Sequence, residues 1–183
     1  MFNRFLSVLL LLVLLPGFLV IALFIFVEDG GPVFFKQNRV GINYSFFNIY
    51  KFRSMKKNTP NVATHCLTNP EQYVLKIGAL LRKLSLDELP NLINIVKGEM
   101  VFVGPRPALY NQDDLMALRV ATGVDKLKPG ITGWSQINGR DELSIEQKVA
   151  FDREYLARKS LWFDLKIILM TVSSVISSRG VKH

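Results

Sequence analysis

The sequence reads FLSVLLLLVLLPGFLVIALFIFV from Phe5 to Val27, which is 23 residues without a charge. A helix needs about 20 apolar residues to cross a bilayer, so this run is long enough for a transmembrane helix. A cleaved signal peptide fits poorly, because the apolar part is too long and the following EDGGP offers no small-x-small cleavage site. The run therefore predicts a membrane segment, residues 1–27, ahead of a separate domain, residues 28–183.

A proline lies at the centre of this run. Pro16 has no backbone N–H and collides with the preceding turn, so it bends a helix. Each arm would then be roughly 16–18 Å long, about half of the ~30 Å hydrocarbon core. Positive residues flank the run at Arg4, Lys36 and Arg39, and this favours keeping both flanks in the cytoplasm. From the residues alone, a re-entrant helix broken at Pro16 and a spanning helix are both open.

The rest of the chain is basic. The formal charge is +8, and residues 28–183 carry 22 Lys and Arg against 15 Asp and Glu. Such an excess favours anionic partners, namely phosphates, nucleic acid or an anionic membrane surface. Cys66 is the only cysteine, which excludes an intramolecular disulfide and fits a reducing compartment. With His65 and His183 as the only histidines, the sequence has too few ligands for a Cys/His zinc site.

The patterning after the membrane run predicts a mixed, helix-rich α/β domain with a small β-hairpin. The hairpin is expected from β-like runs at 33–35 and 46–52, and a long polar loop follows them. MVFVGPRP, residues 100–107, predicts a short strand and a stiff loop. A last apolar helix carries two charges, which suits either the core or the membrane interface. The predicted helices are 73–84, 87–97, 109–121, 144–159 and 162–177.

Two adjacent acids, Asp87 and Glu88, lie within LRKLSLDELPNL, residues 81–92. One interpretation is a helix cap: Ser85 and Glu88 match a capping box, although Pro90 favours a helix that begins at Asp87. A helix start also attracts phosphate. One carboxylate could then attack phosphorus while the other holds a divalent metal together with substrate phosphates. The residues leave both interpretations open.

Basic residues surround the acid pair in the sequence. Arg106 stands between Pro105 and Pro107, and a guanidinium on such a stiff backbone suits bidentate phosphate binding, although a surface arginine in a rigid turn fits too. YKFRSMKK, residues 50–57, mixes bases with aromatics, which is typical of nucleic-acid binding but equally of a phosphate or membrane-surface patch. KPGITGWSQINGR, residues 128–140, could line a pocket or form a structural turn.

Six segments, taken in order and spacing, resemble the bacterial sugar transferase family and, within it, the small monotopic phosphoglycosyl transferases. The resemblance covers nearly the whole chain, from the membrane run to about Thr171. The segments are GPVFFKQNRVG, YKFRSM, LRKLSLDELPNLINIVKGEM, VGPRP, KPGITGWSQINGR and SLWFDLKIILMT.

The resemblance implies transfer of a sugar 1-phosphate from a UDP-sugar to polyprenyl (undecaprenyl) phosphate, with release of UMP. This is the first membrane step in making O-antigen, capsule or a glycoprotein glycan. It also implies a re-entrant helix broken at Pro16, interfacial amphipathic helices, and a catalytic domain on the cytoplasmic face of the bacterial inner membrane. The implied cofactor is Mg²⁺. The implied partners are the UDP-sugar, polyprenyl phosphate and membrane lipid but no nucleic acid, and a homodimer stays open.

Carried over by position, the resemblance makes Asp87 the nucleophile of a covalent phosphosugar intermediate and Glu88 a ligand of Mg²⁺. The remaining candidates are substrate-binding residues from the matching segments: Arg82, Arg106, Arg140, Lys51, Arg53 and Pro105. Two other classes of function remain as alternatives. One is a membrane-tethered, anion-binding adaptor without catalysis, and the other is a hydrolase that passes the phosphosugar to water.

Overall fold

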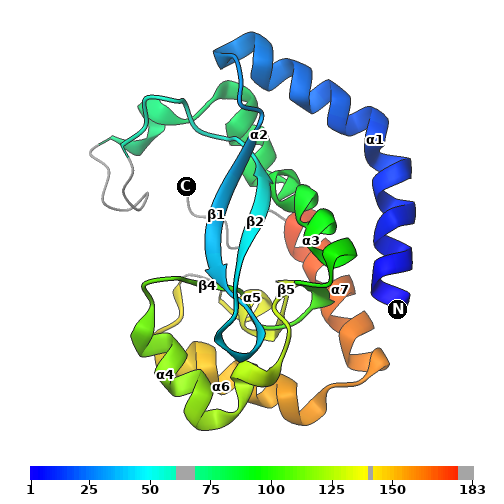
Figure 1. Cartoon of the computed structure of the whole chain (residues 1–183), viewed down its shortest axis with the longest axis vertical. Coiled ribbons are helices and arrows are strands. Elements are labelled where there is room, and N and C mark those ends of the chain that lie inside the picture. Colours follow the sequence, from blue (N-terminus) through cyan, green and yellow to red (C-terminus); the bar gives the residue numbers. More distant parts are fainter. Residues whose placement is uncertain (61–68, 140–141, 177–183) are drawn as a thin grey trace.

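The computed structural model describes residues 1–60, 69–139 and 142–176. A long β-hairpin runs through the middle of the molecule, with helices around it (Figure 1). Its strands, β1 (Phe34–Val40) and β2 (Phe46–Phe52), pair antiparallel from Phe34 with Phe52 to Val40 with Phe46, which confirms the predicted hairpin. The short β4 (Ala108–Leu109) adds to the other side of β1. A second sheet pairs β3 (Val101–Val103) with β5 (Gly130–Thr132) in parallel.

The helices confirm a helix-rich, mixed α/β fold. Helix α6 begins where the sequence predicts, with the Ser144 side chain accepting from the N–H of Gln147 in a capping box. Helix α4 begins four residues later than predicted, because residues 108–109 join the sheet instead. The helices that follow α1 are α2 (Lys76–Lys83), α3 (Leu92–Lys97), α4 (Asp113–Thr122), α5 (Trp134–Ile137), α6 (Ile145–Arg158) and α7 (Leu161–Ile176).

The N-terminal apolar run forms one long helix, α1 (Phe2–Asp29), with Pro16 inside it. Among the described residues it is the one helix long and apolar enough to cross a membrane. The helix is continuous, whereas the resemblance implies a helix broken at Pro16. Its ribbon nevertheless changes direction about midway along its length (Figure 1). The effect of the proline is therefore a bend within a continuous helix, as expected when a single carbonyl loses its partner.

Both ends of α1 are attached to the domain that follows it. Near its start, the Arg4 guanidinium donates a hydrogen bond of 3.4 Å to the carbonyl of Lys97. At its end, Asp29 accepts from the guanidinium of Arg53, and Glu28 accepts from the first two N–H groups of α2. Phe18 and Ile25 are also buried in a cluster with Phe52, so α1 lies along one side of the domain and is held at both ends.

Helix α7 presents apolar residues on two sides. Phe163 and Ile167 are buried in a cluster with Val103 and Tyr155. On the other side Leu161, Trp162, Leu169 and Val172 are more than half exposed. The sequence predicts that this helix lies either in the core or at the membrane interface. The structure shows one face packed in the core and an exposed apolar face that suits a membrane interface.

Candidate active site

The two acids lie on a tight 3₁₀ helix, Leu86–Asn91, that continues directly into α3. The predicted helix start at Asp87 is wrong, since the helix begins one residue earlier. Residues i and i+3 of a 3₁₀ helix share a face, so Leu86 and Leu89 together pack against the core cluster that contains Phe52. Ser85 precedes the helix with a φ of 54° and makes no capping hydrogen bond with its side chain, so the capping-box interpretation does not hold.

The same spacing turns Glu88 and Asn91 toward strand β2. This strand is at the edge of its sheet, where unpaired backbone groups need partners. Asn91 and Asn94 meet that need, since the side-chain oxygen of each accepts from the N–H of Tyr50 at 3.2 Å. Asn94 also donates to the carbonyl of Asn48 at 2.7 Å. These hydrogen bonds fix the acid-bearing segment against β2.

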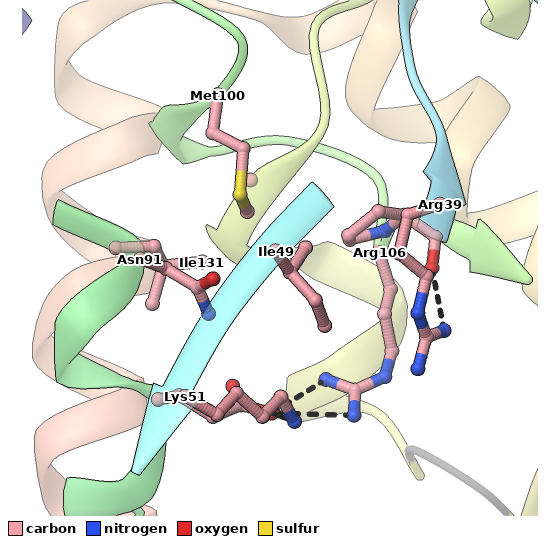
Figure 2. A pocket seen from close by; sticks show the side chains of 10 residues that line it. Arg39, Ile49, Lys51, Asn91, Met100, Arg106 and Ile131 are labelled. Atoms are coloured by element: carbon pink, nitrogen blue, oxygen red, sulfur yellow. Dashed lines mark hydrogen bonds and ion pairs between the residues drawn. The ribbon is translucent and has the colours of Figure 1, made fainter. Parts of the chain in front are cut away.

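Glu88 is held between two cations that come from different parts of the sequence. Its Oε1 lies 2.6 Å from Nζ of Lys51, on β2, and 3.3 Å from Nη2 of Arg106. Figure 2 shows Arg106 directed toward Lys51, with Ile49 and Met100 on the apolar side of the site. The Lys51 and Glu88 side chains are only 17% and 20% exposed, whereas Arg106 is 41% exposed and can reach a ligand from solvent.

The backbone around Arg106 is fixed on both sides. The N–H of Gly104 donates to Thr132, and the carbonyl of Pro105 accepts from the N–H of Gly130, so the segment extends the β3–β5 pairing. A side chain at Gly104 would place its Cβ 2.4 Å from the carbonyl of Lys128, so the close approach requires glycine. Pro105 is buried, and its part in the site is to hold the arginine that follows it.

Asp87 lies beside Glu88 on the next face of the 3₁₀ helix and is half-buried. Burial raises the pKa of its carboxyl above the ordinary value, and the negative charge of Glu88 adds to the rise. Lys51 and Arg82 oppose the rise through their positive charges, so the predicted residue Arg82 does contribute to the field at Asp87. The arrangement yields a poorly solvated carboxylate among cations, which suits attack on an electrophile.

One cavity adjoins Glu88, and a second cavity lies on the far side of Arg39, Arg106 and Pro107, which line both. The first has a volume of about 10 Å³, room for about one water, and Glu88 and Lys51 line it. The second has about 190 Å³ and no carboxylate in its lining. The described residues that line the second cavity are Arg39, Arg106, Pro107, Ala108, Leu109, Gln112, Leu115, Arg119, Ser135, Gln136 and Lys148.

Not all predicted residues meet at this site. Lys51, Glu88 and Arg106 are in contact, Asp87 adjoins Glu88 in the chain, and Arg82 acts on Asp87 through its charge, whereas Pro105 lines neither cavity. Arg53 lies elsewhere: the residue is 7% exposed, and its guanidinium donates to Asp29 and to the carbonyl of Gly30. Arg140 lies outside the described residues. Arg39, Gln136 and Lys148 were missed as individual site residues, although Arg39 and Gln136 lie in two of the segments that carry the resemblance; no motif marks Lys148. Only the pairing of β1 with β4 and the turn into α5 bring them together.

A divalent cation has two candidate ligands here. The described residues contain no group of three or more His, Cys, Asp and Glu side chains that could hold a metal ion. Mg²⁺, however, needs only one or two protein carboxylates when substrate phosphates complete its shell. Adjacent carboxylates at Asp87 and Glu88 fit that requirement, provided that Lys51 or Arg106 yields its place on Glu88.

Comparison with known proteins shows the family to which this chain is similar. A family model described as "Bacterial sugar transferase" matches residues 1–178. The "Uncharacterized sugar transferase EpsL" of Bacillus subtilis is 44% identical over 154 residues, covering 84% of this chain and 75% of that protein. The "Exopolysaccharide production protein ExoY" of Rhizobium meliloti is 40% identical over 185 residues, covering 93% and 81%.

Longer relatives match as well. The "UDP-glucose:undecaprenyl-phosphate glucose-1-phosphate transferase" of Escherichia coli is 41% identical over 174 residues. The match covers 91% of this chain but only 38% of that protein, so the chain spans little more than a third of this relative's length.

Proposed function

The chain belongs to the bacterial sugar transferase family, and we propose that it moves a sugar 1-phosphate from a UDP-sugar to polyprenyl phosphate, releasing UMP. The name of the Escherichia coli relative describes transfer of glucose 1-phosphate to undecaprenyl phosphate. One observation carries the proposal: a half-buried Asp87 stands next to Glu88, which is bound by Lys51 and Arg106. A cap needs none of these cations, whereas a transfer between phosphates uses them.

The reaction proceeds in two displacements at one phosphorus. A carboxylate oxygen of Asp87 attacks the sugar-bearing phosphorus of the donor, and the bond to the bridging oxygen breaks, so UMP leaves with the electron pair. An oxygen of polyprenyl phosphate then attacks the same phosphorus. The bond to Asp87 breaks, the carboxylate is restored, and the product is a polyprenyl diphosphate sugar. Lys51, Arg82 and Arg106 surround the phosphates and offset their charge.

The donor has room in the second cavity, which is joined to the Glu88 site through Arg106. Arg106 lines both cavities, so phosphates bound at its guanidinium would lie beside Glu88, the residue that follows Asp87, with the rest of the donor in the larger space. That space has Arg39 and Lys148 as cations, Gln136 as a polar side chain, and no carboxylate among its described lining residues. This composition favours the nucleotide end of an anionic donor.

Mg²⁺ is the cofactor in this proposal. Glu88 would be its protein ligand, and when bound it would supply positive charge to the donor phosphates. Lys51 and Arg106 hold Glu88 in place and contribute charge of their own.

We propose further that α1 enters the membrane and returns, so that the protein is monotopic on the cytoplasmic face of the inner membrane. Three features support this. The helix bends midway, its two ends both contact the domain, and large apolar side chains remain exposed along it. The exposed face of α7, with Trp162 and Leu169, would lie at the same interface.

A labelling experiment tests this topology. In a Cys66→Ser background, cysteines placed at Asn3 and Asn58 are expected to react with a membrane-impermeant maleimide from the cytoplasmic side only. A cysteine at Leu15, exposed near the middle of α1, is the control that should stay unlabelled in the bilayer. Labelling of Asn3 and Asn58 from opposite sides would contradict the re-entrant arrangement and favour a spanning helix.

The function itself is tested by UMP release from a panel of UDP-sugars with Mg²⁺ and undecaprenyl phosphate. We expect release that requires the lipid and occurs with one or a few sugars. Release well beyond one equivalent without lipid would instead identify a hydrolase. Release with none of the sugars would favour the adaptor without catalysis. The same panel identifies the sugar.

A further inference from the structure

A buried network of charged and polar side chains lies directly behind Arg106. Arg119, on α4, donates from Nε and Nη2 to Oδ2 of Asp152, on α6, at 3.1 and 2.6 Å. The other oxygen of Asp152 accepts from the hydroxyl of Ser135, in α5, at 2.9 Å. All three residues are at least nine-tenths buried, with Asp152 only 1% exposed. Helices α4 and α6 lie together at one end of the molecule (Figure 1).

The network has one hydrogen bond that points out of it, and this bond reaches the active site. Nη1 of Arg119 donates to the carbonyl oxygen of Arg106 at 2.9 Å. The peptide unit between Arg106 and Pro107 has no N–H, so this carbonyl is its only group that can form a backbone hydrogen bond. Fixing the carbonyl fixes the direction in which the Arg106 side chain leaves the backbone.

Stability alone gives a weak reason for such a network. Burying an arginine and an aspartate removes both from water, and well-packed apolar residues of similar size often serve the fold as well. Apolar residues could not donate a hydrogen bond here, whereas the Arg119 guanidinium donates one to the carbonyl of Arg106. Arg119 and Ser135 also line the second cavity, so the network supports the wall on which Arg106 stands.

We infer that Arg119, oriented by Asp152 and Ser135, is a positioning residue that directs Arg106 toward Glu88 and the donor phosphates. The donor phosphates in this inference rest on the proposed function, whereas the hydrogen bonds of Arg119 do not. Arg119 acts through Arg106 and does not itself need to touch the reacting atoms. A lysine at position 119 keeps the charge but loses the planar fork that reaches Asp152 and the carbonyl together.

A double-mutant cycle tests this inference. Arg119→Lys is expected to lower kcat/KM by about tenfold when Arg106 is present, because small displacements of a phosphate-binding group are costly. In an Arg106→Ala background the same change should cost less than about twofold, since its target is gone. Loss of thermal stability, by contrast, should be similar in both backgrounds. Equal losses of kcat/KM in the two backgrounds would overturn the positioning role.

Two additions keep the test decisive. If Arg119→Lys does not fold, Ser135→Ala removes only one hydrogen bond and should give a smaller loss with the same dependence on Arg106. UDP affinity, measured by calorimetry in the same cycle, needs no turnover. In a protein that shows no lipid-dependent transfer, Arg119→Lys could still weaken UDP binding only when Arg106 is present. That result would preserve the positioning role and reject the transferase. A protein that binds no UDP would overturn both. Arg153→Lys, exposed on α6, is the control and should change neither quantity.

Discussion

Replacing Asp87 with asparagine is expected to lower the transfer rate by about ten-thousand-fold or more, as is typical when an enzyme loses its nucleophile. Asparagine has nearly the same size and keeps an acceptor oxygen, so the 3₁₀ helix and its packing of Leu86 and Leu89 should persist. Its amide, however, cannot form the acyl phosphate that the proposed mechanism requires.

The same substitution should not destabilise the fold. Because the pKa of Asp87 is raised in the folded protein, ionising this carboxyl costs stability as the pH rises through that pKa. The asparagine protein lacks this cost, so at neutral pH we expect a Tm equal to or above that of the wild type. A protein that gains stability while losing activity is what a functional carboxylate, rather than a structural cap, would give.

Mass spectrometry gives the direct measurement for Asp87. With donor but no lipid acceptor, the wild-type protein should gain the mass of one sugar phosphate, located on the peptide that contains residue 87. Asp87→Asn should gain none. Asp113→Asn, at the exposed start of α4, is the matched control and should behave as wild type. Turnover of Asp87→Asn within tenfold of wild type would reject Asp87 as the nucleophile.

Local periodicity accounts for most of the fold that the sequence predicted. Strand β2 alternates in burial over its first four residues, and α2, α6 and α7 follow apolar spacing that is visible within each segment. The parallel pairing of β3 with β5 was not predicted, since residues 130–132 follow Lys-Pro and read as part of a turn. Its hydrogen bonds come from a partner about 30 residues away, which no local pattern can indicate.

In the candidate site, too, some residues could be predicted from a single segment, whereas others depend on contacts between distant segments. Asp87, Glu88 and Arg106 could be predicted because each lies in a short, distinctive segment. Arg53 lies in such a segment too, yet its side chain is bound by Asp29 at the end of α1. Its neighbour Lys51 lies two residues away and does reach Glu88. The segment was informative, but which of its bases faces the site depends on what each packs against in the folded chain.

Replacing Glu88 with glutamine is expected to lower kcat by about a hundred- to a thousand-fold, the usual cost of losing one charged group at a site of phosphate or oxyanion chemistry. Glutamine keeps the shape of the side chain but removes the charge that binds Lys51 and Arg106. Since an amide is a poor ligand for Mg²⁺, the concentration of Mg²⁺ that gives half of the maximal rate should rise. The charge that raises the pKa of Asp87 also disappears, so the lower limb of the pH–rate profile should move to lower pH.

The Mg²⁺ dependence and the Tm of Glu88→Gln together show whether Glu88 is a metal ligand or only a structural partner of Lys51. A purely structural role would lower the Tm, because Lys51 is only 17% exposed and would lose its charged acceptor, worth about 1.5–3 kcal/mol. It would leave the Mg²⁺ dependence unchanged. Glu154→Gln removes an acid that binds Trp134 and Arg158 at the surface, so it serves as the matched control with unchanged kcat. A Glu88→Gln protein with wild-type Mg²⁺ dependence and a lowered Tm would therefore assign Glu88 to the scaffold of the site and leave Asp87 as the sole candidate carboxylate ligand there.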